Sequence, residues 1–431
     1  MSREMKDSGI EWIGKIPKEW TTAKLKQIGS YINGYAFKPE EWSDLGKPII
    51  RIQDLTGSIS NPNYYSGTID NRYLITRGDI LVSWAATLDA FIWEKEDGWL
   101  NQHIFKAVPI SGVNPRFFYW LIKVAMDNMN NDNKHGIVMQ HVTVGLFGNF
   151  IVGIPSFSEQ QKIADYLDKV CGEVDEMIAL QEKMIEELKA YKQSVITEAV
   201  TKGLNPNVPM KNSGIDWIGE IPEHWHLEPL KYCFGRRSEK NNPIKTKERL
   251  SLSIDKGVTL YAEKTTNLDR FKDDFTQYQL AYPNDIVLNC MNMIVGAVGL
   301  SHYLGCVSPI YYVIYPTKND IDALYYSYLL NIPSIRGVYF SLGKGIYAIE
   351  RGEGRVNTCR LKVSYNDFGR LEIPKPPIDE QKEITAFILN KSSDIDSLIA
   401  VKQQKIEELR EYKKSVIYEY VTGKKEATIY D

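Results

Sequence analysis

Two stretches of the chain carry apolar residues at alternating spacings of three and four, with charged and polar residues between them. They run over residues 159–202 and 380–423, and neither contains a proline. Apolar positions at this spacing line one side of a long helix and favour packing against a single partner helix. The sequence therefore predicts two uninterrupted helices, each roughly 60 Å long. The residues expected to pair the helices are Ile163, Leu167, Val174, Ile178, Leu188, Ile388, Ile395 and Leu409.

The two stretches are copies of each other. Aligned without gaps, about 18 of 44 positions carry the same residue, which indicates an internal duplication. A helix of this length cannot bury its apolar side within one small domain, so the expected partner is the other copy. Two unrelated amphipathic helices on separate domains are the alternative.

The segments that precede the two helices are also related. SGIEWIGKIPKEW at 8–20 returns as SGIDWIGEIPEHW at 213–225, and RGDILVSW at 77–84 corresponds to PNDIVLNC at 283–290. Short β-branched and aromatic runs separated by Gly, Pro, Asn and Asp are typical of a module with substantial sheet. The Gly-, Pro- and Asn-rich segment 203–214 is typical of an exposed connection between the two copies.

The predicted fold is α+β, with two globular α/β modules separated by two long antiparallel helices that form a coiled-coil spacer. The duplication gives this arrangement a pseudo-twofold internal repeat. A chain of two such modules could recognise two different half-sites at a fixed separation on DNA. The expected boundaries are a first module at 1–158, a helix at 159–203, a second module at 204–379, a helix at 380–425 and a tail at 426–431.

Composition narrows the class of protein. The 431 residues are 43% hydrophobic and 25% charged, and no apolar run has the length needed to span a bilayer. The N-terminus lacks the apolar core of a signal peptide, so we expect a cytoplasmic protein without a membrane partner. The five cysteines are scattered without a CxxC pair, which predicts packed thiols in a reducing compartment. A net charge of −3 is unusual for a protein that binds nucleic acid unaided.

No motif for catalysis is evident. The chain lacks the GxxxxGK[ST] loop that cradles phosphates, and it lacks the carboxylate and lysine pattern that follows the turn of a metal-dependent nuclease. His224 and His226 stand alone, which favours a surface pair over a metal site. The sequence therefore predicts positioning residues and no reaction centre.

Candidate DNA contacts are polar and basic side chains in the segments between predicted strands. A single Asn or Gln in such a segment is more often a turn or capping residue. Asp79 and Asp285 occupy equivalent turns and are expected to be structural. The candidates in the first module are Arg51, Gln53, Ser83, Trp84, Gln102, His103, Lys134, His135, Gln140 and His141. Those in the second module are Arg236, Arg237, Asn289, Asn292, Lys344, Tyr347, Arg351, Arg355, Asn357 and Arg360, the last six in a glycine-rich loop.

Several of these segments occur together in a known family. The tandem SGI-[ED]-WIG-x-IP segments, the GDILVSW and NQHIF stretches, the IP…EQxxI entry to each helix and the ELxxYKxSVIxExVT end of each helix support the match. With them the chain closely resembles the specificity subunit of type I restriction–modification systems. The resemblance covers nearly all of the chain. Base-contacting residues do not carry over, because such relatives differ most inside the modules.

The resemblance implies two target recognition domains that contact a bipartite, asymmetric site on double-stranded DNA through the major groove. It also implies that the helices dock two methyltransferase subunits, and that restriction or translocase subunits join the full complex. The chain itself would bind no cofactor, whereas S-adenosylmethionine, Mg²⁺ and ATP would act on partner subunits. Two other functions stay open: a self-contained DNA methylase or nuclease with an unrecognised motif, and a coiled-coil adaptor that binds only proteins.

Overall fold

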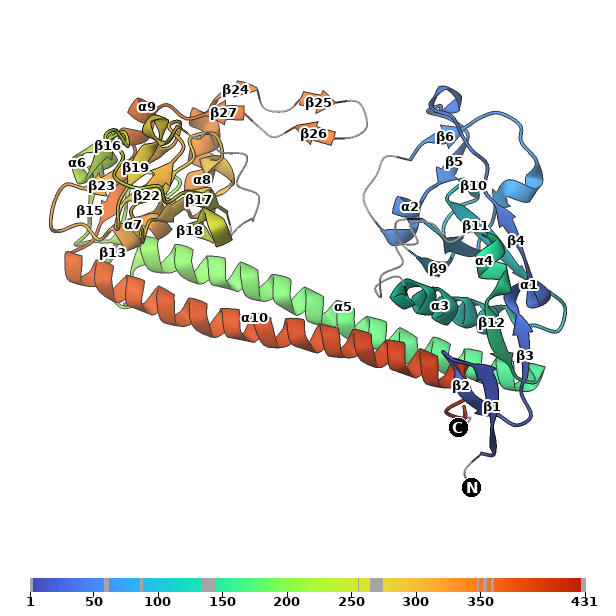
Figure 1. The fold of residues 1–431 in the computed structure, drawn as a ribbon. Helices are drawn as coiled ribbons and strands as arrows, with labels where there is room; N and C mark the ends of the chain where they lie inside the picture. Colours follow the sequence, from blue (N-terminus) through green and yellow to red (C-terminus); the bar gives the residue numbers. More distant parts are fainter. Residues whose placement is uncertain are drawn as a thin grey trace. The chain divides into compact units, whose positions relative to one another are not determined.

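The computed structural model of the chain describes residues 3–57, 62–85, 88–132, 144–254, 256–263, 274–346, 349–351, 355–357 and 360–427. The chain forms two compact units, and Figure 1 colours it by residue number. Unit 1 comprises residues 1–182 and 403–431, and unit 2 comprises residues 183–402. Each unit contains a mixed module of strands and short helices together with one half of each long helix. The predicted α+β class is confirmed.

The module of unit 1 is built on two four-stranded sheets. The first sheet has the strand order β4-β11-β8-β9 and is antiparallel throughout. The second sheet has the strand order β6-β5-β10-β7, and its strands β5 and β10 are parallel. The strands are β1 (Met5–Ile10), β2 (Gly14–Pro17), β3 (Thr21–Lys24), β4 (Gly29–Asn33), β5 (Lys47–Ile50), β6 (Tyr64–Tyr65), β7 (Leu74–Ile75), β8 (Ile80–Ser83), β9 (Asp89–Ile92), β10 (Gly98–Leu100), β11 (Ile104–Pro109) and β12 (Ile151–Ile154). The helices are α1 (Leu25–Ile28), α2 (Ile52–Thr56), α3 (Pro115–Asp132) and α4 (Val144–Asn149).

The module of unit 2 repeats the first of these sheets, the one with the order β4-β11-β8-β9. Its order is β16-β23-β20-β21, again antiparallel, and smaller two-stranded ladders surround it. The strands are β13 (Met210–Asn212), β14 (Glu220–Pro222), β15 (His226–Pro229), β16 (Phe234–Arg237), β17 (Leu250–Ser253), β18 (Gly257–Leu260), β19 (Gln279–Ala281), β20 (Ile286–Leu288), β21 (Val298–Leu300), β22 (Gly305–Val307), β23 (Tyr312–Pro316), β24 (Lys344–Ile346), β25 (Ile349–Arg351), β26 (Arg355–Asn357), β27 (Arg360–Lys362) and β28 (Glu372–Lys375). The helices are α6 (Leu230–Cys233), α7 (Ala323–Leu329), α8 (Pro333–Leu342) and α9 (Tyr365–Gly369).

The two long helices are α5 (Phe157–Lys202) and α10 (Ile378–Val421). Within unit 1, Lys413 pairs with Asp175 at 2.6 Å and Arg410 with Glu182 at 3.3 Å. A later position on α5 therefore pairs with an earlier position on α10, so the two helices are antiparallel. Within unit 2, Lys192 on α5 pairs with Asp396 on α10 at 2.7 Å. This pair is the counterpart of Asp175 and Lys413, because the two copies are offset by 221 residues along the sequence.

The helix ends belong to the cores of the modules. Each long helix follows directly after the last strand of its own module, so its first turns pack into that module. Ile163 and Leu167 lie in the main core of unit 1, together with Val416 and Val421 from the end of α10. The main core of unit 2 contains Ile384 and Ile388 from α10 together with Ala199 and Val200 from the end of α5. Each module is thus completed by the end of the other module's helix.

The residues expected to pair the helices therefore divide into two groups. Ile163, Leu167 and Ile388 serve the module cores. Farther along the helices, Val174, Ile395 and Leu409 are buried, whereas Ile178 and Leu188 are half-buried. A heptad pattern does not distinguish a helix partner from a module core, because both bury one side of the helix.

A repeated set of polar contacts fixes each module to its helix. Trp20, fully buried in unit 1, donates its indole N–H to Glu159 at 3.0 Å, and the fully buried Trp225 of unit 2 donates to Glu380 at 2.8 Å. The next residue of each helix is a buried glutamine whose side-chain oxygen accepts a backbone N–H at 2.8 Å, from Asn114 in unit 1 and from Asp322 in unit 2. The EQ pair at the start of each helix is therefore explained by what its two side chains bind.

Candidate nucleic-acid interface

Four of the residues predicted to contact DNA lie together in unit 1, where β8 ends and β11 begins. Ser83 is the β-ladder partner of Ile104, and the Trp84 N–H donates to the His103 carbonyl at 3.4 Å. The Trp84 and His103 rings are 5.5 Å apart and inclined at 61°. Gln102 and His103 are exposed, whereas Ser83 is fully buried and donates to the carbonyl of Ala85 at 3.2 Å. Ser83 thus shapes the strand end, and the other three present a polar and aromatic surface.

Arg51 and Gln53 lie on another segment of unit 1, at the start of α2. The Arg51 backbone N–H donates to the Asp54 carboxylate at 2.8 Å, which organises this short helix. The Arg51 guanidinium lies 6.0 Å from the centre of the Trp42 ring, and Gln53 is exposed. Of the two side chains, Gln53 is the one presented to solvent.

The equivalent strand end in unit 2 carries Asn289 and Asn292. The side-chain oxygen of Asn289 accepts the Met291 N–H at 3.1 Å, so this amide partly serves the turn itself. Asn292 is half-buried and begins the 3₁₀ turn Met293–Val295. The turn closes on Gly296 at φ +97°, where a Cβ atom would lie 2.7 Å from the Arg336 guanidinium carbon. Only glycine allows this approach at a left-handed backbone position.

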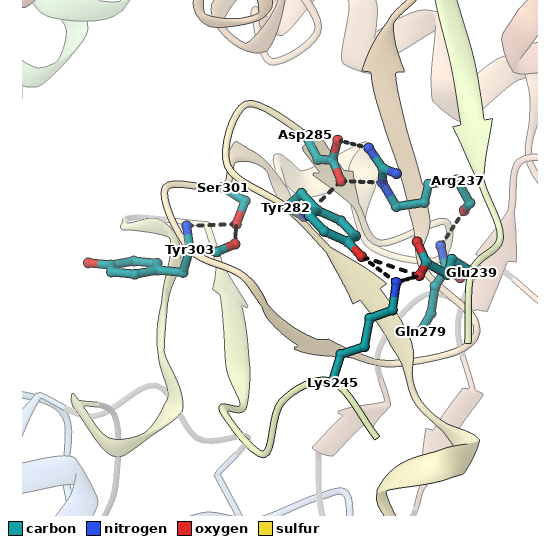
Figure 2. A network of polar contacts seen from close by, with 8 residues as sticks. All are labelled: Arg237, Glu239, Lys245, Gln279, Tyr282, Asp285, Ser301 and Tyr303. Atoms are coloured by element: carbon teal, nitrogen blue, oxygen red, sulfur yellow. Dashed lines mark hydrogen bonds and ion pairs between the residues drawn. The ribbon is translucent and has the colours of Figure 1, made fainter. Parts of the chain in front are cut away.

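Adjacent arginines on β16 have different roles. Arg236 is exposed, and its guanidinium lies 5.2 Å from the Tyr312 ring centre and 4.8 Å from that of Tyr365. Arg237 forms a two-point ion pair with the buried Asp285, at 2.6 Å and 2.9 Å (Figure 2). The charge of Arg237 is therefore already neutralised inside the protein. Arg236 is the better placed of the two for a DNA contact.

The Arg237 pair belongs to a network of polar residues in unit 2 (Figure 2). The hydrogen bond that Arg237 donates to Asp285 raises the pKa of Arg237 above its ordinary value, against the effect of burial. Beside it, Lys245 donates to Glu239 at 2.5 Å and to the Tyr282 hydroxyl at 3.2 Å. The hydrogen bond from Lys245 lowers the pKa of the Glu239 carboxyl. These contacts stabilise the sheet edge and hold its charges in pairs.

Asp79 and Asp285 have the structural role expected of them. Asp285 accepts the Tyr282 N–H at 2.8 Å in addition to its ion pair, and Asp79 accepts the Thr76 N–H at 2.8 Å and pairs with Lys106 at 2.6 Å. Each carboxylate closes a turn before a buried strand and is neutralised by a cation from another strand of the same sheet. The cation comes from β11 in unit 1 and from β16 in unit 2.

The predicted glycine-rich loop of unit 2 contains paired strands. β24 pairs with β27 and β25 pairs with β26, both antiparallel and in the same register. Lys344 is exposed on β24. The backbones of Arg351, Arg355, Asn357 and Arg360 lie on these strands, but their side chains fall outside the described part. Tyr347 and the candidates Lys134, His135, Gln140 and His141 of unit 1 also lie outside the described residues.

Two basic residues near this region were missed by the sequence analysis. Arg336 lies in the largely apolar helix α8, where burial lowers its pKa, and it donates to the Asn331 side chain at 3.0 Å. Lys362 is exposed on β27, directly opposite Lys344. Arg336 has no motif to mark it, and Lys362 lies just beyond the glycine-rich segment. Strand alternation around Leu361 was the signal that could have identified Lys362.

The described cysteines are buried and protonated. Burial raises the pKa of Cys171 to about 11 and that of Cys233 to about 12, which opposes formation of a nucleophilic thiolate. Within the described ranges, no group of three or more His, Cys, Asp or Glu side chains is arranged to hold a metal ion. In the same part of the chain, no helix combines the length and the apolar character needed to cross a bilayer.

Comparison with known proteins agrees with this architecture. Residues 17–190 match the family model of the type I restriction modification DNA specificity domain. The EcoBI specificity subunit of Escherichia coli is 25% identical over 92% of this chain and 84% of its own length. The putative MjaX specificity subunit of Methanocaldococcus jannaschii is 23% identical over 96% of this chain and 95% of its own length.

A solved structure shares the fold. A chain from a study of complex assembly and conformational transition of the type I R–M system superimposes with a TM-score of 0.63 at 13% identity, covering 94% of this chain and 98% of the other. This likeness supports a shared fold. The first module and most of α5 match the type I restriction modification DNA specificity domain, and the chain is similar over nearly its whole length to specificity subunits of type I restriction enzymes.

Proposed function

We propose that this chain is the non-catalytic subunit that selects the DNA target of a type I restriction–modification complex. Residues 1–158 and 204–379 are the two target recognition domains, and each recognises one part of a bipartite, asymmetric site. The observation that carries the proposal is a shared sheet order with different residues at the equivalent strand end. That end carries Ser83 and Trp84 in unit 1 and Asn289 and Cys290 in unit 2.

The long helices supply the surface for partners. Met177 on α5 and its repeat equivalent Leu398 on α10 are 45% and 52% exposed, and Tyr191 and its equivalent Tyr412 are 55% and 52% exposed. Apolar side chains that stay exposed on an otherwise charged helix are typical of a protein contact. Their occurrence at equivalent positions supports two like partners, the two methyltransferase subunits. Restriction or translocase subunits then join through these subunits.

The division of chemistry follows from the charge and the site. With a net charge of −3, the chain needs its partners to supply much of the attraction to DNA phosphates. S-adenosylmethionine, Mg²⁺ and ATP act on those partners, and adenine methylation takes place there. The complex works in the cytoplasm, where the DNA of the host is accessible.

The test is to map methylated adenines in the genome of the host and to use the resulting motif as the probe. We expect the full chain to bind this duplex weakly alone and much more tightly with methyltransferase subunits, with affinity that falls as salt rises. Equal affinity for random DNA with and without the partner would refute the proposal. The isolated chain is expected to transfer no label from S-adenosylmethionine and to cut no DNA in Mg²⁺. Either activity would establish a self-contained enzyme.

A substitution on the helices separates the spacer from the recognition modules. Ile178→Glu with Leu188→Glu places charges at two half-buried positions of α5. We expect loss of helix pairing and of assembly with methyltransferase subunits, without a change in the preferred sequence. A folded variant that methylates a different motif would contradict this assignment. Leu180→Glu, at an exposed position on the same helix, is the control for helix pairing.

A further inference from the structure

Two lysines of unit 2 face each other across a pair of strands. β24 and β27 are antiparallel, and their register makes Lys344 the direct partner of Lys362. Successive residues of a strand point to opposite sides, and Leu361 is buried at 7% exposure. Lys362 must therefore point away from the core. Both lysines are exposed, and like charges directly opposite on one side of a strand pair destabilise it.

The two lysines also lack an acidic partner within the described residues. In contrast, Lys245, Lys318 and Lys375 of the same unit are all held by carboxylates. The backbone register of the adjacent strands pairs a second set of like residues, Arg351 with Arg355. The strand pair thus concentrates positive charge that no acidic side chain neutralises among the described residues.

The base of this strand pair is attached to the candidate interface. The Val363 N–H, next to Lys362, donates to the carbonyl of Cys290 at 3.2 Å, and Cys290 follows Asn289 at the end of β20. The thiol of Cys290 has a pKa raised by burial, and the charges of Lys362 and Arg236 oppose that rise. Lys362 and Arg236 therefore lie close to the same strand end.

We propose that Lys344 and Lys362 form a clamp for a phosphate of duplex DNA, which fixes the second module on its half-site without selecting its sequence. A phosphate between the two ammonium groups replaces their mutual repulsion with attraction to a shared anion, and lysine binds phosphate as a point charge. Base selection is left to side chains at the end of β20. This inference rests on the proposed function and adds a role for these two residues.

The competing explanation is that the lysines only protect the strand pair. Exposed lysines on short edge strands keep a sheet from pairing with another molecule. If the lysines only prevent this pairing, a variant without these charges should aggregate, with no change in DNA binding. The two explanations therefore differ in what is measured.

The experiment compares two complexes, each made of the full chain assembled with methyltransferase subunits. One complex carries the original chain, and the other carries the Lys344→Gln, Lys362→Gln double variant. Binding to the mapped duplex and to a random duplex is measured over a range of salt concentrations. Each phosphate that is no longer neutralised lowers the slope of log affinity against log salt by about 0.9, and the two lysines share one phosphate, so the double variant should lose about 0.9 on both duplexes. The ratio of the two affinities should stay unchanged. Lys344→Arg with Lys362→Arg should preserve the slope.

The matched control is Lys211→Gln with Lys231→Gln, which removes the same charge from exposed positions on β13 and α6 of unit 2. Its slope should stay close to that of the original. An unchanged slope in the clamp variant, with or without aggregation, would overturn the clamp. So would a selective loss on the mapped duplex, which would indicate base contacts. If the original complex shows no sequence preference, the proposed function fails, whereas the clamp is still decided on random DNA.

Discussion

The pair of Arg237 and Asp285 allows a sharp test of the division between structural and DNA-contacting residues. The sequence analysis named Arg237 as a candidate contact and expected Asp285 to be structural. Asp285 is 1% exposed, and its carboxylate accepts two bonds from Arg237 and one from the Tyr282 N–H. We expect Asp285→Ala to destabilise unit 2 and to leave the preferred DNA sequence unchanged.

The magnitude follows from what the substitution leaves behind. Removal of one partner from a buried ion pair costs about 3–5 kcal/mol, because the remaining charge is uncompensated. The side chain of Arg237 keeps 23% of its exposure, so water can partly solvate the guanidinium. The expected loss is therefore at the lower limit, about 3 kcal/mol. Arg237→Ala leaves a more deeply buried carboxylate, which retains only the Tyr282 N–H, and should cost at least as much.

Hydrogen exchange of backbone amides in β16 and β20 measures this loss locally, which is needed because a chain of two units does not unfold in one step. The double variant Arg237→Ala, Asp285→Ala should be less destabilised than the sum of the single variants, with a coupling of about 1.5–3 kcal/mol. Unchanged exchange, combined with a lost or altered DNA preference in Arg237→Ala, would refute the structural assignment. Arg236→Ala is the control, and we expect normal exchange with weakened DNA binding.

Further predictions concern the frame of the molecule. Gln381→Ala should destabilise unit 2 by roughly 2–4 kcal/mol in hydrogen exchange, because its fully buried amide bonds three backbone groups. Lys192→Gln and Lys413→Gln should each cost under about 1 kcal/mol, and a difference above this would show that the repeated helix pairs are not equivalent. Contact with two lysines lowers the pKa of Glu228 to about 2, so its stabilising effect should persist at pH 6 and be lost as the pH falls from its ordinary range towards 2. Residues 1–203 alone should be unstable or form a dimer by ultracentrifugation, since the end of a second copy's helix can replace the missing end of α10.

The long helices and the paired modules could be predicted because their signals are local or repeated. Heptad spacing, the absence of proline and the duplication all act over short stretches of sequence. The same spacing could not separate Ile163, which serves a module core, from Val174, which lies farther along the helix. That distinction depends on the position of the strand that precedes the helix, because this strand sets where the helix begins. The position of the strand is determined by the whole module.

The candidate interface was predictable only in part, for a geometric reason. Ser83 and Trp84 could be placed because a turn aspartate and an apolar strand precede them. Arg236 and Arg237 are adjacent residues of the same type, so the sequence does not distinguish them. Only the sheet shows that Arg237 binds Asp285. Lys362 was missed because its role depends on the residue across the ladder, 18 positions away in the sequence.

The arrangement of the cores explains how one frame can carry two different modules. Val200 at the end of α5 lies in the core of unit 2, where its carbonyl accepts the Tyr325 hydroxyl at 2.7 Å. At the end of α10, the Tyr418 hydroxyl donates to the Trp12 carbonyl of unit 1 at 2.9 Å. Each long helix therefore begins in one core and ends in the other. The contacts between the helix ends and the cores, here called the frame contacts, must therefore be similar in both copies. The strand ends at Trp84 and Asn289 lie outside those contacts, and different residues there leave the frame intact.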